Sequence, residues 1–131
     1  MNWHKQKYSK LLDAEVDKDI FNLIEWMNKQ SVHTFYSCQG FPDAQKYGFN
    51  EKIIPGYILF KYTPQSFSFV SYLVENSLGV NWRTDEFGNP MHINFYETQG
   101  YRSCIDIPVD HHRDLLNHWK ELAATYTSKS L

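Results

Sequence analysis

Apolar side chains recur at helical spacing in three segments of the chain. Residues 15–29, 63–78 and 110–126 place them three or four positions apart, which predicts three amphipathic helices. Thr63, followed by a proline, is a typical helix start, and Gly79 is a typical residue just beyond a helix end. The side chains expected to face the core are Val16, Ile20, Leu23, Ile24, Met27, Phe67, Val70, Leu73, Val74, Leu78, Leu115, Leu116, Trp119, Leu122 and Tyr126.

Five other segments are rich in β-branched and aromatic residues, or alternate apolar with polar positions, as strands do. The expected strands are 32–37, 57–62, 80–84, 91–97 and 101–107. Glycine, proline, aspartate and asparagine predict a loop over 39–55, and residues 1–13 are expected to form an N-terminal arm or a short helix. The element order predicts an α+β domain of two layers, with one mixed or antiparallel five-stranded sheet and the helices mainly on one face.

Composition narrows the function classes. The chain has 131 residues, 42% of them apolar, which is enough for one domain whose core needs no metal or disulfide. A net charge of −2, without a lysine and arginine cluster, argues against extended duplex nucleic acid as a partner. No apolar run is long enough to cross a membrane. A polar N-terminus and two cysteines without C-x-x-C spacing predict a cytoplasmic protein with reduced thiols.

The last two expected strands predict a hairpin with a polar face. If its loop is three residues long, polar pairs fall on the face away from the helices: His92–Asp106, Asn94–Cys104 and Tyr96–Arg102. His92, oriented by Asp106, has the chemistry to move a proton near neutral pH, and Arg102 suits a phosphate or carboxylate. The alternative, weighted somewhat higher, is a solvated or dimer-forming face with ordinary cross-strand pairs.

A second candidate site follows the strand at 32–37. Thr34 and Ser37 supply hydroxyls, Gln39 an amide, and Gly40 permits a turn with positive φ, so this segment predicts a small pocket for a polar ligand. Cys38 is a candidate nucleophile or redox-sensitive thiol, although a cysteine without a visible base partner is more often buried and inert.

The final expected helix carries a weaker pattern. His111, Asp114 and His118 lie three and four residues apart on one side, a donor set that zinc accepts. A solvated helix flank explains the same spacing, and we favour it, so no metal site is expected. His112 is expected at the edge of the core.

The segment Asp17–Gly40 resembles a known family signature. An acidic residue before a helix, Asp17, an asparagine, Asn28, and the strand-end motif Thr34-Phe-Tyr-Ser37-Cys38-Gln-Gly40 resemble the wybutosine-synthesis tRNA methyltransferase family over about residues 15–80. Small uncharacterised bacterial proteins with an S-C-[EQ]-G motif are similar too. The resemblance implies S-adenosylmethionine as cofactor and a modified guanine of tRNA as substrate. Gln39 and Phe41 stand where that family has a small residue and an arginine, and the resemblance implies no catalytic residue here.

Three functions follow from these patterns. The first, which we prefer, is binding of a small polar or nucleotide-like ligand near the Ser37–Gly40 turn. The second is an enzyme, either a divergent S-adenosylmethionine-dependent RNA-modifying protein or a hydrolase using His92 and Asp106. The third is a homodimeric interaction protein whose surface aromatics meet a second copy.

Overall fold

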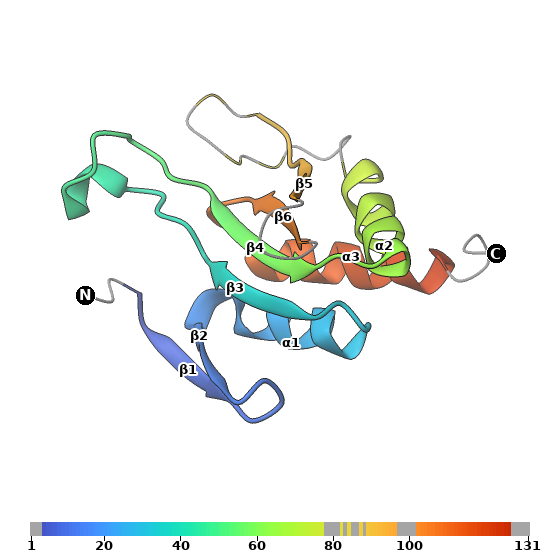
Figure 1. Cartoon of the computed structure of the whole chain (residues 1–131). Coiled ribbons are helices and arrows are strands. Elements are labelled where there is room, and N and C mark those ends of the chain that lie inside the picture. Colours follow the sequence, from blue (N-terminus) through green and yellow to red (C-terminus); the bar gives the residue numbers. More distant parts are fainter. Residues whose placement is uncertain are drawn as a thin grey trace.

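The structure, a computed structural model, describes residues 4–77, 82, 84, 87, 89–96 and 102–126 (Figure 1). This part of the chain holds three α-helices and two antiparallel sheets, which bears out the α+β prediction. The helices are α1 (Phe21–Lys29), α2 (Pro64–Glu75) and α3 (His112–Tyr126). The strands are β1 (Gln6–Ser9), β2 (Ala14–Asp17), β3 (Thr34–Cys38), β4 (Gly56–Lys61), β5 (Ile93–Tyr96) and β6 (Arg102–Ile107).

The main sheet has the order β3-β4-β6-β5, and the helices cover one of its faces (Figure 1). Alternation along β4 and β6 turns Ile58, Phe60, Ile105 and Ile107 toward those helices, where all four are fully buried. Burying each such side chain stabilises the fold by about 1.5–3 kcal/mol. The helices contribute their own apolar side chains to this core: Leu23, Ile24, Met27, Val70, Leu73, Leu115 and Trp119.

The prediction of one five-stranded sheet was wrong. Residues expected to be an arm and the first helical turn form the hairpin β1–β2, a separate two-stranded sheet, with Asp13 in its turn at φ 52°. The helical pattern was misleading. Val16 stands four residues before Ile20, as it would on one face of a helix, but it reaches the core from strand β2. A short 3₁₀ turn, η1 (Lys18–Ile20), then leads into α1.

Four of the five expected strands are confirmed. The strands predicted at 32–37, 57–62, 91–97 and 101–107 correspond to β3, β4, β5 and β6. The strand predicted over 80–84 falls mostly outside the described residues, as does Gly79. Thr63 caps α2 as predicted. Its hydroxyl accepts from Ser66 N at 3.0 Å and the Ser66 hydroxyl accepts from Thr63 N at 3.0 Å, a reciprocal pair of the kind that stabilises a helix start by about 1 kcal/mol.

Candidate functional site

Polar side chains form a row across the main sheet, at one level along its strands. Cys38 of β3 pairs with Tyr57 of β4, and Tyr57 pairs with Asp106 of β6. His92, just before β5, completes this row: its Nε2 lies 3.1 Å from Asp106 Oδ2, and its carbonyl oxygen accepts a hydrogen bond from Asp106 N at 3.3 Å. We call Cys38, Tyr57, Asp106 and His92 the polar row. Because partners across a sheet share a face, the row lies on the face turned away from the helices.

The predicted hairpin register is confirmed. Asn94 pairs with Cys104, and Tyr96 pairs with Arg102. This register puts Cys104 next to the polar row, half-buried, where burial and the nearby carboxylate of Asp106 raise the pKa of its thiol to about 11. Cys104 is therefore a protonated, weakly reactive thiol at neutral pH.

Arg102 is engaged by an aromatic ring. Its guanidinium lies 4.7 Å from the ring centroid of Phe35, a cation–π contact. Phe35 occupies the bulge of β3, where the register shifts between Thr34 and Tyr36. A phosphate or carboxylate at Arg102 would bind beside this ring.

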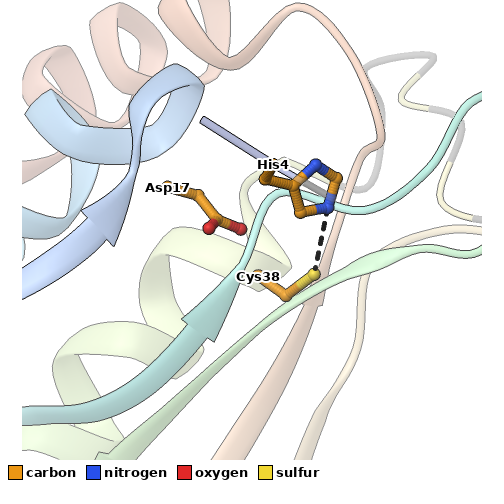
Figure 2. Close-up of side chains that lie close together, drawn as sticks. All are labelled: His4, Asp17 and Cys38. Carbon is orange, nitrogen blue, oxygen red and sulfur yellow. Dashed lines mark hydrogen bonds between the residues drawn. The ribbon is translucent and has the colours of Figure 1, made fainter. Parts of the chain in front are cut away.

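A cluster of three donor side chains lies at the β3 end of the polar row (Figure 2). His4, Asp17 and Cys38 point toward one another, and their nitrogen, oxygen and sulfur donor atoms all lie within 4.8 Å of one another. Cys38 Sγ is 3.7 Å from His4 Nε2. Asp17 is buried, whereas His4 and Cys38 are half-buried. We call these three residues the donor cluster.

The donor cluster is held by its neighbours. Asp17 accepts hydrogen bonds from Gln39 N at 3.0 Å and from Gln6 Nε2 at 3.1 Å. The imidazole of His4 stacks on the ring of Phe41, with centroids 4.1 Å apart. Burial raises the pKa of the Cys38 thiol, Gly40 N lowers it as a hydrogen-bond donor, and Asp17 raises it. The thiol alone is therefore a poor nucleophile at neutral pH.

Gly40 and Gln39 have roles within the fold. Gly40 has a φ of 83°, and a side chain there would place its Cβ 2.6 Å from Gly56 N, so the two backbones meet where only glycine fits. Beyond it, Phe41 and Ile54 extend the pairing of the β3 and β4 chains. Gln39 donates its amide to Asp19 Oδ2 at 3.1 Å and accepts from Asp19 N at 3.0 Å, which fixes η1 against the end of β3.

Thr34 and Ser37 line a small hollow between the β1–β2 hairpin and β3. Its volume is about 170 Å³, below the 300–1,000 Å³ of common ligand pockets. The hydroxyl of Thr34 accepts from Asn28 Nδ2 at 2.9 Å, so it is already used in joining β3 to α1. This hollow is too small for a nucleotide.

A larger groove of about 470 Å³ lies between α1 and α3. Its lining includes Trp26 and the cations Lys29, Arg113 and Lys120. Arg113 and Lys120 are seven residues apart, which is two turns of a helix. This spacing alone predicts that they lie on the same side of α3. This groove belongs to the helical side of the molecule, whereas the polar row lies on the other face of the sheet.

The residues of the possible zinc pattern in the last helix, His111, Asp114 and His118, do not come together as one set of metal ligands. His111 lies before α3 with a φ of 59° and is exposed, with Nδ1 3.7 Å from Asp114 Oδ2. His118 Nε2 is buried and has no hydrogen-bond partner among the described residues. The donor cluster is the one metal-capable group within the described ranges. His112 is buried, as expected, with Nε2 2.8 Å from Pro108 O.

Sequence reasoning singled out Cys38 but missed its neighbours in the donor cluster. The sequence pattern indicated Asp17 only as an acidic residue before a helix, and it gave no reason to single out His4. His4 and Cys38 are 34 positions apart in the sequence, which is no recognisable ligand spacing. Only the β1–β2 hairpin, itself unpredicted, brings them together.

Comparisons with protein-family models, with curated proteins and with solved structures found no match. Of the helices that the structure describes, none has the length and apolar character needed to span a membrane.

Proposed function

We propose that this protein binds a small polar ligand on the face of the main sheet that carries the polar row. One observation carries the proposal: Cys38, Tyr57 and Asp106 stand at the same level on three adjacent strands, and His92, just before β5, continues the row. Strand pairing fixes the spacing of these side chains, so hydrogen-bonding groups are held ready for a ligand without a mobile loop.

The chemistry of the row suits a ligand with both donors and acceptors. The His92 imidazole is oriented by Asp106 and is more than half exposed, so its second ring nitrogen is accessible. Burial raises the pKa of Tyr57, with Cys38, Cys104 and Asp17 adding to the effect, so its phenol keeps its proton and can donate.

Aromatic rings extend the same face and favour a ligand with a flat group. Tyr57 is 40% exposed, and Tyr36, which pairs with Leu59 in the neighbouring row, is 64% exposed. Exposed rings of this kind stack on bases and other planar groups. A nucleotide-like ligand is therefore the class that we propose first, with S-adenosylmethionine included on the strength of the family resemblance.

Thermal unfolding with and without ligand tests the proposal. The panel is the common nucleoside monophosphates and S-adenosylmethionine, each at millimolar concentration. A ligand at 100 times its Kd stabilises the folded state by about 2.7 kcal/mol, which raises Tm by several degrees. We expect such a rise for at least one compound. No rise with any of them would overturn the proposal.

A matched pair of variants locates the effect. His92→Asn removes the accessible imidazole of the row, and the same change at His111, exposed before α3, is the control. Asparagine tolerates the positive φ of position 111. The ligand-induced rise in Tm should disappear in His92→Asn and remain in His111→Asn. Equal rises in both variants would place the ligand elsewhere.

A further inference from the structure

We propose that His4, Asp17 and Cys38 bind a divalent transition-metal ion, with zinc as the ion of choice. The inference goes beyond the proposed function and does not depend on it, since the three donor side chains form the site without any organic ligand. The donor cluster is drawn from the segment before β1, the end of β2 and the end of β3, so the fold itself assembles it (Figure 2).

The spacing of the donor atoms fits a tetrahedral ion. Zinc bonds to sulfur at about 2.3 Å and to imidazole nitrogen at about 2.0–2.1 Å, so a tetrahedral angle separates the two donors by about 3.6 Å. Cys38 Sγ and His4 Nε2 are 3.7 Å apart. The Asp17 carboxylate oxygen lies within 4.8 Å of both, so it has to move closer to bond to the same ion.

The surroundings resemble the outer shell of a metal site. Ligating carboxylates and imidazoles are normally fixed by further contacts, which orient them before the ion arrives. Asp17 is fixed by Gln39 N and Gln6 Nε2, and the His4 ring is fixed by stacking on Phe41. Gly40 N, 3.4 Å from Cys38 Sγ, supplies a donor that stabilises a thiolate.

The donor types select the ion. A thiolate with an imidazole suits zinc and related transition metals, whereas magnesium and calcium prefer sites made of oxygen. Binding displaces the proton of the Cys38 thiol to solvent as the sulfur–metal bond forms. Three protein ligands leave a fourth position for water or a ligand donor atom. Because Cys38 is also the first residue of the polar row, the proposed ion would lie next to that row.

Metal binding to the purified full chain, freed of metal by a chelator, tests the inference. Titration of Zn²⁺ against a chromophoric chelator should show one tight site per chain. Co²⁺ should give the charge-transfer absorption of a thiolate ligand. Cys38→Ser and His4→Ala should each weaken Zn²⁺ binding at least about tenfold, and Cys38→Ser should abolish the Co²⁺ charge-transfer band.

The controls use the other thiol, Cys104, and His111, an exposed histidine before α3. Cys104→Ser and His111→Asn should leave both the Zn²⁺ affinity and the Co²⁺ band unchanged. His4→Ala keeps the experiment decisive if Cys38→Ser fails to fold, because His4 lies outside the strands and is only half-buried. Failure of the wild-type chain to bind Zn²⁺ would overturn the inference. So would binding that survives both donor substitutions, or a Co²⁺ band that is lost in Cys104→Ser.

Discussion

His92 Nε2 lies 3.1 Å from Asp106 Oδ2, across the pairing of β5 with β6. The side chains are 56% and 30% exposed, so water screens their attraction and the pair adds little to stability. The pair fixes the orientation of an imidazole on an open sheet face, as the binding role that we propose for His92 requires.

Because the pair adds little to stability, replacing His92 should impair ligand binding without destabilising the fold. His92→Asn should lower the free energy of unfolding by less than about 1 kcal/mol, because exposed ion pairs contribute about that much or less. Urea denaturation of the wild type and the variant measures the difference. A loss above about 2 kcal/mol would mean that His92 is a structural residue.

Gly40 should be intolerant of a side chain. Gly40→Ala combines a left-handed φ with a Cβ 2.6 Å from Gly56 N, so we expect a loss of about 3 kcal/mol or more. Gly48→Ala is the matched control: its φ is 92°, but a Cβ there meets nothing within 4 Å, so only the backbone strain of about 1 kcal/mol remains. Chemical denaturation compares the two. Equal losses would show that the approach of Gly40 to Gly56 is unimportant.

His112 should make stability depend on pH. Burial lowers its pKa below the usual value, while the carbonyls of Pro108 and Gln39 and the carboxylates of Asp19 and Asp110 partly offset the effect. The unfolded chain therefore binds a proton first as the pH falls. Stability from this residue is complete above the unfolded value of about 6.5 and is lost as the pH falls toward the lower folded value.

The measurement is the pH dependence of unfolding in the wild type and in His112→Gln, which keeps a side-chain donor but does not titrate. The difference in unfolding free energy between them should be constant from pH 8 to 7 and should shift against the wild type below about pH 6.5. A difference that stays constant down to pH 5 would contradict the assigned pKa direction.

Cys104 should react slowly with alkylating agents. Since its thiol has a pKa of about 11, only a small fraction is thiolate at pH 7.5, and the rate should keep rising with pH through 10. Mass spectrometry of Cys38→Ser treated with iodoacetamide follows this thiol alone. A rate that levels off near pH 8.5 would indicate an ordinary, exposed cysteine.

Local patterns predicted the parts of the fold that local chemistry decides. The Thr63 cap and the register of the β5–β6 hairpin were both readable, since each depends on residues close in sequence. The β1–β2 hairpin was not, because Val16 satisfies helical and strand spacing alike. The donor cluster could not be predicted for the same reason, because only that hairpin brings His4 next to Cys38. The resemblance to the methyltransferase family remains a prediction.

The most direct test of the proposed binding face is an amide NMR titration of the ¹⁵N-labelled chain with the compound that gives the largest rise in Tm. We predict saturable shift changes centred on Cys38, Tyr57, Asp106 and His92. Changes confined to the α1–α3 groove, around Lys29 and Arg113, or the absence of any saturable change, would contradict the account.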